Sequence, residues 1–504
     1  MDYFKFVPFD QRKTGLLLSD DLRMPSGIGT MSKEIVLKTI HHFNWIQLGG
    51  AITHPDKGKI IQMEKEMTHL TGVEESRMRI YPTDGYGNPD LIRTLIDKEK
   101  PDFILHFTDP RFWIWLYQME HEIRLKIPIF FYHIWDDLPF PRYNENYYES
   151  CDWLGCISKQ TYNIVRNVRE RKPTKKWQVS YIPHGIDHTL FKPISADKPG
   201  KMLELKLKNS AGVESVVKKT EYEDMITFRQ GVLQGHDVDF VVFYNNRNIR
   251  RKMPGDVILA FKTFWEKLDE EKKDKVVLLM HTNVVDQNGT DLMAVANTIA
   301  PAWKILFSTQ KLETKYLNYL YNIVDVTINM ASNEGFGLTT AESLMAGTMI
   351  ISNVTGGLQD QHGWKDEEGN LIECDKHLNS EWSSNHDKRY KKHGKWAMPI
   401  FPTNRALVGS PPTPYIFDDR CCWMDAAKAI MKIYKLSAKA RDKRGLLGRE
   451  FLLSKDVQMS SEMMGNNFIN YIDTVFENWK PRKRFTLIKT GMGEQKRLPT
   501  GITL

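Results

Sequence analysis

The chain has 504 residues, of which 41% are hydrophobic and 26% are charged, and its formal net charge is +7 with a pI near 8.8. This length excludes a single simple hydrophobic core and favours two or three domains, while the composition is that of an ordinary soluble globular protein. The mild positive charge admits an anionic partner, such as a nucleic acid, a phosphorylated sugar or a membrane surface, without requiring one.

The cysteines and the N-terminus bear on the compartment. Five cysteines lie scattered along the chain without metal-ligand spacing: Cys151, Cys156, Cys374, Cys421 and Cys422. An odd, scattered set suits a reducing compartment. Residues 1–13 lack the apolar run of a signal peptide, and we expect no transmembrane segment. The sequence therefore predicts a cytoplasmic protein, including the case of a virus-encoded protein that acts in the cytoplasm of its host.

The first half of the chain begins with the order strand, glycine loop, helix. The apolar run 16–18 is followed by a loop that contains Gly27 and Gly29, and then by helical spacing through Ile35 and Ile40. This order opens a doubly wound α/β domain. Further buried parallel strands are predicted at 45–48, 78–81, 103–107, 127–131 and 153–157.

Charged residues follow the carboxyl ends of two of these strands. They are Asp84, Asp109 and Arg111. Ligands bind beyond the carboxyl ends of strands in sheets of this kind, so these side chains are candidates for a binding site. The Asp-Pro pair that begins at Asp109 is also an ordinary turn signal, so both interpretations stay open there.

The second half repeats the alternation of strand and helix from residue 238 onward. Arg247 and Lys252 follow a predicted strand, and a helix begins at Pro254. Arg250 and Arg251 lie between them and add positive charge. Fixed cations at this place would stabilise negative charge on a bound anionic group.

The segment 329–359 carries the strongest functional signal. A predicted strand ends in the loop Glu334-Gly335-Phe336-Gly337-Leu338, which leads into a helix. Backbone N–H groups at a helix N-terminus suit an anion such as a diphosphate. Glu334 and Glu342 can reach one ligand that lies across this helix start. Because carboxylates repel phosphate, we expect them to bind neutral hydroxyls, and a nucleotide sugar offers both kinds of group.

Three segments together resemble a known family. The segment from Glu334 to Gly347, with Gly356 and Gly357 beyond the next strand, resembles the E-x7-E segment of family-4 retaining glycosyltransferases. The segment 179–193 (VSYIPHGIDHTLFKP) is similar to the family's domain-end element, with His184 in place of the usual Asn. The spacing of Arg247 and Lys252 also matches.

The resemblance implies a role for each matched residue. His133, Arg247, Lys252 and Glu334 are the predicted catalytic residues. Donor-binding residues are Gly27, Gly29, Arg247, Lys252, Leu312, Gly335, Phe336, Gly337, Leu338 and Glu342. Asp84, Asp109, Arg111 and Asp136 are placed on the acceptor side. We expect no metal at Asp136 and Asp137, and no cofactor beyond the nucleotide sugar itself as co-substrate.

The fold that the resemblance implies is α/β GT-B, with two Rossmann-like domains facing a cleft and a C-terminal helix that returns to the first domain. The predicted divisions are an acceptor-side domain 1–194, a linker or insertion 195–237, a donor-binding domain 238–455 with an inserted lobe 360–414, a terminal helix 456–480 and a basic tail 481–504.

The implied reaction transfers a hexosyl group from a nucleotide-linked donor to a hydroxyl acceptor, with retention of the anomeric configuration. UDP is the expected nucleotide, and the sequence does not identify the acceptor.

One alternative function is a phage-type DNA glycosyltransferase that acts on a hydroxymethylated base, for which nucleic acid would be a partner. A nucleotide-sugar epimerase and a non-catalytic sugar- or nucleic-acid-binding protein are two others. The match from Glu334 to Gly347 argues against the epimerase, and the set Arg247, Lys252 and Glu342 disfavours the binding protein. The oligomeric state is left open.

Overall fold

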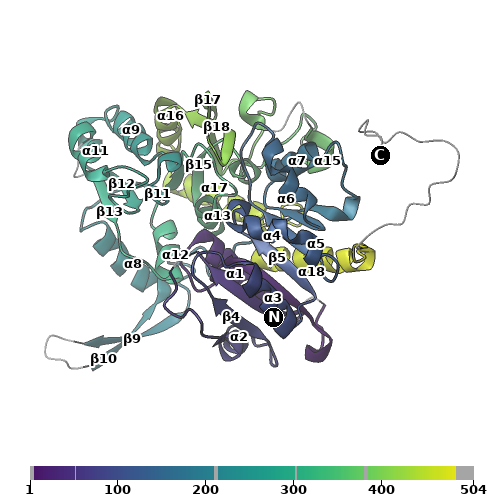
Figure 1. The fold of residues 1–504 in the computed structure, drawn as a ribbon. Coiled ribbons are helices and arrows are strands. Elements are labelled where there is room, and N and C mark those ends of the chain that lie inside the picture. Colours follow the sequence, from purple (N-terminus) through teal and green to yellow (C-terminus); the bar gives the residue numbers. More distant parts are fainter. Residues whose placement is uncertain (1–4, 52, 209–213, 301–303, 380–383, 484–504) are drawn as a thin grey trace, which may run out of the picture.

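The structure is a computed structural model that describes residues 5–51, 53–208, 214–300, 304–379 and 384–483. It contains two large β-sheets, each covered by helices on both faces (Figure 1). The predicted α/β architecture of two Rossmann-like domains is confirmed. Of the predicted basic tail 481–504, residues 484–504 lie outside the described residues.

Eight strands form the first sheet in the order β3-β4-β2-β1-β5-β6-β7-β8. Their bounds are β1 (Lys13–Asp20), β2 (Phe43–Gly50), β3 (Ile61–Gln62), β4 (Met78–Pro82), β5 (Phe103–Phe107), β6 (Ile129–His133), β7 (Trp153–Cys156) and β8 (Val179–Tyr181). Only the edge strand β3 pairs antiparallel, with β4. The order reverses between β1 and β5, and a crevice for ligands forms beyond the carboxyl ends of the strands at such a point.

Helices cover both faces of this sheet. One face carries α1 (Gly27–Thr39), α2 (Glu64–Thr71) and α18 (Ser461–Asn478), and the other carries α3 (Pro89–Glu99), α4 (Ile114–Gln118), α5 (Glu120–Ile123), α6 (Glu145–Glu149) and α7 (Lys159–Val168). Successive residues of β1 enter opposite cores, with Leu17 in one and Leu16 and Leu18 in the other. Burial on both faces explains why this strand is a continuous apolar run.

The second sheet has six parallel strands in the order β13-β12-β11-β14-β15-β16. Their bounds are β11 (Phe240–Asn245), β12 (Val276–His281), β13 (Ile305–Ser308), β14 (Val326–Asn329), β15 (Met349–Asn353) and β16 (Ala397–Ile400). Its strand order reverses between β11 and β14. The Arg247 loop follows β11 and the Glu334 loop follows β14, so this second reversal point brings the two loops together.

The helices of the second domain also form two layers. One layer is α9 (Pro254–Trp265), α11 (Leu292–Ile299) and α16 (Trp423–Tyr434), and the other is α8 (Glu221–Val232), α12 (Thr314–Asn322), α13 (Leu338–Met345) and α17 (Ala438–Leu453). The short helices α10 (Glu270–Lys273), α14 (Leu358–Gln361) and α15 (Cys374–His377) lie in connections. One apolar cluster includes residues from α1 and α18 and from α12 and α13, so the two domains share a continuous core.

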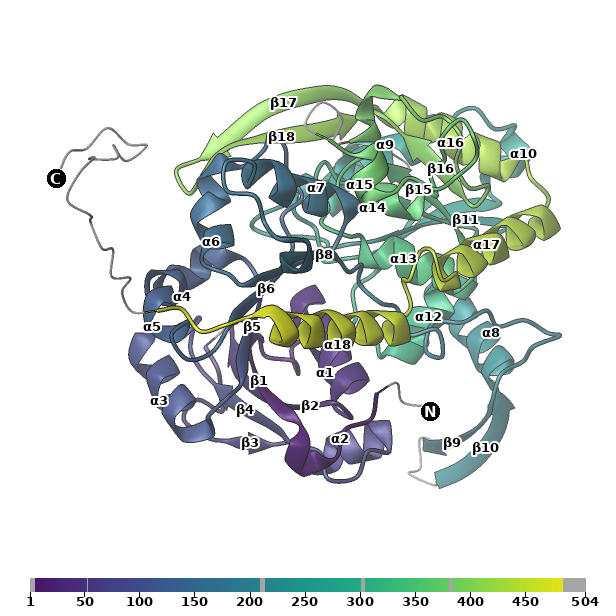
Figure 2. The same ribbon diagram turned by 90° about the vertical axis from the view of Figure 1, so that its right-hand side faces the viewer.

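Both segments that the sequence places outside the two domain cores contain regular structure. Within 195–237, β9 (Met202–Lys208) and β10 (Glu214–Thr220) pair as a hairpin that projects from the body of the molecule (Figures 1 and 2). Within 360–414, β16 completes the second sheet as its edge strand. A second hairpin follows, formed by β17 (Pro402–Ser410) and β18 (Thr413–Cys421). The predicted domain limits stay a prediction.

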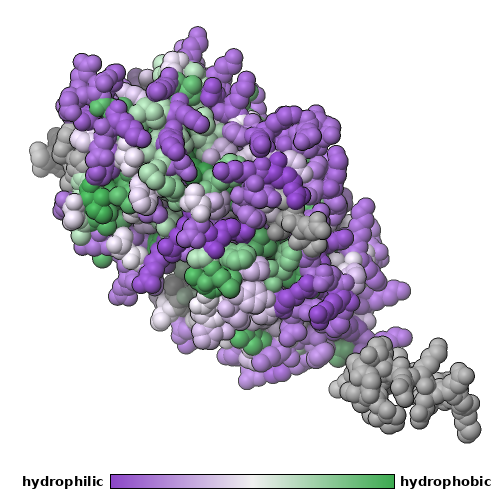
Figure 3. Space-filling view, turned by 90° about the horizontal axis from the view of Figure 1, so that it is seen from above, coloured by the Kyte–Doolittle hydropathy of each residue, from purple (hydrophilic) through white to green (hydrophobic). Residues whose placement is uncertain are grey.

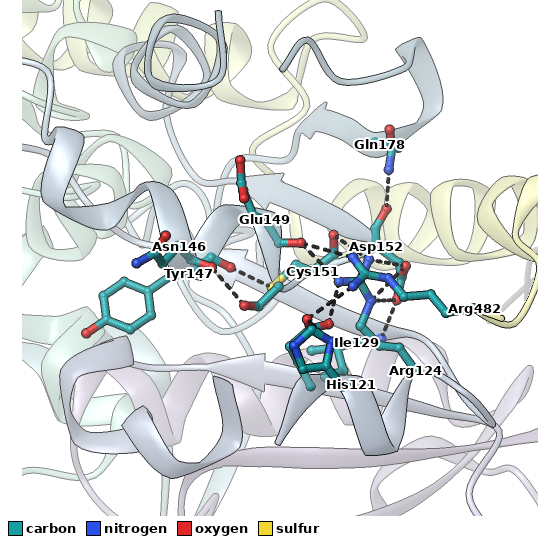
Figure 4. Close-up of polar contacts among 12 residues, drawn as sticks. His121, Arg124, Ile129, Asn146, Tyr147, Glu149, Cys151, Asp152, Gln178 and Arg482 are labelled. Atoms are coloured by element: carbon teal, nitrogen blue, oxygen red, sulfur yellow. Dashed lines mark hydrogen bonds and ion pairs between the residues drawn. The ribbon is translucent and has the colours of Figure 1, made fainter. Parts of the chain in front are cut away.

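The terminal helix α18 crosses back to the first domain, as predicted (Figure 2). It packs against α1 closely enough that a Cβ on Gly465 would lie 2.6 Å from the Cβ of Lys38. Beyond the helix, the backbone N–H of Arg482 donates to the carbonyl of Arg124 at 2.9 Å, and its guanidinium donates to Glu120 at 3.1 Å (Figure 4). These contacts fasten the end of the described chain to the first sheet's helices.

The outer surface seen in Figure 3 is mainly hydrophilic, with separate small hydrophobic patches. Within the ranges that the structure describes, no helix combines the length and the hydrophobicity needed to cross a lipid bilayer.

Candidate functional site

A cleft of about 1080 Å³ lies where the carboxyl ends of the two sheets face each other. It brings together most of the predicted site residues: Gly27, Asp109, Arg111, His133, Asp136, Arg247, Lys252, Glu334, Gly335, Phe336, Gly337, Leu338 and Glu342. Its volume slightly exceeds the range of about 300–1000 Å³ that is typical of pockets for small ligands, which leaves room for two substrates at once.

Three predicted residues are not among those that line the cleft. Asp84 follows β4. Strand β2 lies between β4 and β1, so Asp84 is distant from the point where the strand order reverses. Its carboxylate forms an ion pair with Lys57. Leu312 follows the edge strand β13 and packs against the apolar core. Gly29 lies against backbone, because a Cβ there would be 2.5 Å from the carbonyl oxygen of Met24. Gly29 therefore shapes the turn that presents Gly27.

The N-terminus of α13 opens into the cleft without a side-chain cap. Its N-cap residue is Gly337, which has φ +89° and offers no hydrogen bond from a side chain. The preceding carbonyls of Phe336 and Gly337 accept from the amide of Gln361 at 2.7 and 3.0 Å, which holds the loop in place. The first N–H groups of a helix lack intrahelical partners, so this end is suited to bind an anion.

Gly337→Ala is expected to destabilise the protein. Its φ is one that residues with a Cβ rarely adopt, and the Cβ would lie 2.4 Å from Cδ2 of Leu358. Strain and overpacking together should lower the free energy of unfolding by about 2–4 kcal/mol, as measured by chemical denaturation. Gly255→Ala is the control, because its Cβ meets nothing within 4 Å in the first turn of α9. An equal loss in both variants would contradict the strain at Gly337.

The basic residues after β11 lie beside this helix end. Lys252 forms a buried ion pair with Glu334. Arg251 donates to the carbonyl of Asn333 at 2.8 Å and lies 3.8 Å from Glu334. Arg247 is 61% exposed and donates to Asp286 at 2.9 Å. The cations are thus held at the cleft by groups that a more strongly charged anion can displace.

The two glutamates of the E-x7-E segment have different environments. Burial disfavours the charged form of Glu334, but attraction to the positive charges of Lys252 and Arg251 together outweighs this effect. The pKa of this carboxyl is therefore lowered. Glu342 accepts a hydrogen bond from the hydroxyl of Tyr321 at 2.7 Å. Burial raises the pKa of Glu342 to about 7. Glu334 is therefore ionised near neutral pH, whereas Glu342 is partly protonated and can also donate a hydrogen bond to a ligand.

The raised pKa of Glu342 predicts a pH dependence of stability. The folded protein binds this proton more tightly than the unfolded chain does, so protonation of Glu342 favours the folded state. This contribution to the free energy of unfolding is fully present below the unfolded pKa of about 4.3 and is lost as pH rises toward about 7. Glu342→Gln should remove this contribution. Denaturation of both proteins between these pH values should show the wild type losing stability relative to the variant as pH rises. Parallel curves would contradict the raised pKa.

His133 occupies the opposite wall of the cleft. It is buried, and both of its ring nitrogens lack a hydrogen-bond partner among the described residues. Burial lowers the pKa of His133 to about 3, so the ring is neutral and offers one donor and one acceptor. A buried polar group without partners is costly, and a ligand in the cleft would satisfy it.

The remaining predicted acceptor-side residues lie on the same wall. Asp109 and Arg111 form a bidentate pair, with the Nε of Arg111 at 2.9 and 3.0 Å from the two carboxylate oxygens. The guanidinium lies over the ring of Trp135 at 5.4 Å. Asp136 faces the cleft near Lys252 and Glu334, and burial raises its pKa to about 6. The pair is therefore rigid, whereas Asp136 is able to exchange a proton.

Several residues of the cleft carried no signal that sequence reasoning could use. Asn333 donates to Asp137 and, at 2.8 Å, to the carbonyl of Phe417, which joins three distant segments. The hairpin β17–β18 supplies Val408, Gly409, Ser410, Thr413, Ile416, Asp418 and Arg420 to the lining. Their place in the cleft depends on long-range contacts, so only the structure reveals it.

Comparisons with known proteins agree in fold. No protein-family profile matches the chain, and no curated protein sequence shows significant similarity to it. Solved structures do match. HepE from Anabaena, in complex with UDP and glucose, has a TM-score of 0.58 and 10% identity over 92% of this chain and 100% of that one. The chain has the GT-B fold.

Two further solved structures match over similar lengths. Sucrose-phosphate synthase from Thermosynechococcus elongatus has a TM-score of 0.60 and 13% identity over 92% of this chain and 100% of that one. A glycosyltransferase from Rickettsia africae has a TM-score of 0.58 and 12% identity over 93% of this chain and 100% of that one. The GT-B fold thus spans nearly the whole chain, although the identity to these structures is very low.

Proposed function

We propose that the protein is a retaining glycosyltransferase that moves a sugar from a nucleotide-sugar donor, with UDP as the nucleotide, to a hydroxyl group of an acceptor. The observation that carries this proposal is the convergence, in one cleft, of the uncapped N-terminus of α13, the cations Arg247 and Lys252, and the carboxyl group of Glu342. Several solved structures of the same fold contain UDP or UDP-glucose.

Each group has a defined task in this mechanism. The diphosphate lies between the α13 amides and the cations, and Lys252 exchanges Glu334 for a phosphate oxygen. Glu334 is then available for a hydroxyl of the donor sugar. Glu342 binds the ribose. The two ring nitrogens of His133 form hydrogen bonds with the sugar and with the leaving phosphate.

The resemblance of the donor-side segments to those of retaining glycosyltransferases supports the stereochemical course that we propose. As the bond between the anomeric carbon and the phosphate oxygen breaks, the diphosphate leaves with the bonding electron pair. The acceptor oxygen attacks the same face and its proton passes to the leaving phosphate, which gives retention without a covalent enzyme intermediate. Closure of the two domains aligns the reactants and excludes water.

Donor hydrolysis in the absence of an acceptor tests the function. The protein is incubated with a panel of nucleotide sugars that includes UDP-glucose, and release of the nucleoside diphosphate is followed over time. We expect slow release from a UDP-linked donor, with binding of UDP detectable by calorimetry. If no nucleotide sugar is bound or hydrolysed, the proposal is wrong. The anomeric configuration of a glycosylated product, determined by NMR, tests retention.

A further inference from the structure

The hairpin β17–β18 reaches from the second domain to the first. In Figure 2 it runs over the top of the molecule, above α6 and α7. Its base is held in the second domain, where Asp419 accepts from the hydroxyl of Thr355 at 2.8 Å and its carbonyl accepts from Asn353 at 2.7 Å. Its distal half lies against residues 111–143 of the first domain.

Five polar contacts join this distal half to the first domain. Tyr415 is the centre of three of them: its hydroxyl accepts from the N–H of Arg142 and donates to the carbonyl of Phe140, both at 3.2 Å, and its carbonyl accepts from the hydroxyl of Tyr143 at 2.8 Å. The N–H of Phe417 donates to the carbonyl of Leu138 at 2.5 Å. Arg111 donates to the hydroxyl of Thr413.

The same hairpin touches both halves of the site. Thr413 contacts Arg111 on the acceptor-side wall, and Phe417 accepts from Asn333 in the Glu334 loop. The hairpin therefore bounds the part of the cleft that lies beyond the donor sugar. An acceptor molecule must therefore fit beneath the hairpin or displace the contacts of the hairpin with the first domain.

Charges in this part of the cleft are compensated locally. Arg111 pairs with Asp109, and Arg420 pairs with Asp418 at 2.8 Å. Arg405 of β17 pairs with Asp419 at 2.5 Å. A phosphate that bound Arg111 or Arg420, which both line the cleft, would have to displace a carboxylate partner in each case, and no helix N-terminus such as that of α13 belongs to the hairpin to add to the attraction. The available groups suit neutral hydroxyls: the carboxyl of Asp136 and the hydroxyl of Ser410.

We propose that the β17–β18 hairpin is a specificity-determining wall that encloses the acceptor and restricts it to a small, uncharged polyhydroxyl compound. This inference rests on the proposed function and names the acceptor class of the same site. A base flipped from a DNA duplex would have to enter a space that the hairpin covers.

The experiment uses the full chain and radiolabelled UDP-glucose. Label transfer is measured to three fractions of an extract of the producing cells: small neutral solutes, small anions and macromolecules, with hydroxymethylated duplex DNA added as a separate probe. Label in the small neutral fraction supports the proposal. Label confined to anions, macromolecules or DNA overturns it, and so does the lack of transfer to any fraction while donor hydrolysis proceeds.

Two variants test the hairpin itself. Tyr415→Phe removes the hydroxyl contacts to Arg142 and Phe140 but keeps the ring, and Thr413→Val removes the contact to Arg111. Because each lost hydrogen bond weakens closure, we expect the ratio of transfer to hydrolysis to fall about tenfold in the two variants. The Kd for UDP of Tyr415→Phe should stay unchanged.

Thr403→Val is the matched control, since Thr403 is exposed on the same hairpin and its hydroxyl donates within the hairpin, to the carbonyl of Arg420 at 3.4 Å. An unchanged ratio in Tyr415→Phe and Thr413→Val, or an equal fall in the control, overturns the role of the hairpin. Failure of the proposed function is distinguishable, because donor binding and hydrolysis would then be missing from the wild type as well.

Discussion

Lys252→Met is expected to reduce donor turnover by about 10²–10³-fold, the usual effect of removing one group that stabilises charge in the transition state. The ammonium group of Lys252 is buried at the start of α9, beside the uncapped end of α13. It is thus placed to neutralise the charge that accumulates on the departing diphosphate. Initial rates of UDP-glucose hydrolysis and calorimetric titration with UDP measure the effect.

The ion pair with Glu334 complicates this variant, because removing Lys252 leaves a buried carboxylate with Arg251 at 3.8 Å. The double variant Lys252→Met, Glu334→Gln removes both charges, so its stability should recover while its activity stays low. Lys262→Ala is the surface control, since this lysine pairs with Glu266 on the exposed side of α9. Turnover like that of the wild type in Lys252→Met would refute the phosphate role.

Arg247→Ala tests the second cation without a folding problem. The side chain is 61% exposed, and when it is lost its partner Asp286 still accepts a hydrogen bond from the N–H of Asn288 at 2.9 Å. A smaller loss of turnover than in Lys252→Met is expected, because solvent screens an exposed charge more than a buried one.

The structure brings most of the predicted donor-side residues together in one cleft, and the reason is local. Arg247, Lys252, Glu334 and Glu342 lie in short loop-to-helix junctions where backbone direction follows from a few consecutive residues. Each junction follows a strand next to the reversal point of the second sheet. Once the alternation of strand and helix is recognised, the topology alone places these residues together.

The predicted acceptor-side residues do not all line the cleft, because the order of strands in a sheet is not a local property of the sequence. Asp84 follows a strand in the same way as Asp109, yet β4 lies two places from the reversal point whereas β5 adjoins it. The sequence pattern of the two strands is the same, so it does not reveal the order of the strands in the sheet. Asp84 is therefore outside the cleft lining and Asp109 is part of it.

The hairpin and the edge strand β16 show a second limit. The four residues of β16 include Pro399, which an edge strand tolerates but which obscures a strand signal. Thr413 and Arg111 are separated by 302 positions, and no periodicity links them. Charge and proline in 360–414 suggest an excursion, whereas the fold uses this segment to complete a sheet and to join the two domains.

The largest loss of stability is expected at Asp152. Its carboxylate pairs with Arg124 at 2.7 Å and accepts from the N–H of Ile129 at 3.0 Å, and both charged side chains are buried (Figure 4). Glu120 pairs with the same arginine at 2.8 Å. Removal of one partner from such a group leaves a buried charge and a backbone donor without compensation, which costs about 3–5 kcal/mol.

Asp152→Ala should therefore lower the free energy of unfolding by that amount in chemical denaturation. It should also loosen the segment after α18, since Arg482 depends on the neighbouring Glu120 and on Arg124. Faster proteolysis near Arg482 would report this second effect. Asp90→Ala is the matched control, because the pair of Asp90 with Arg93 is exposed and solvent screens its attraction. Equal losses in the two variants would mean that burial of the Arg124 group does not determine its contribution. A much larger loss at Asp152 would show that burial of the Arg124 group determines its contribution to stability.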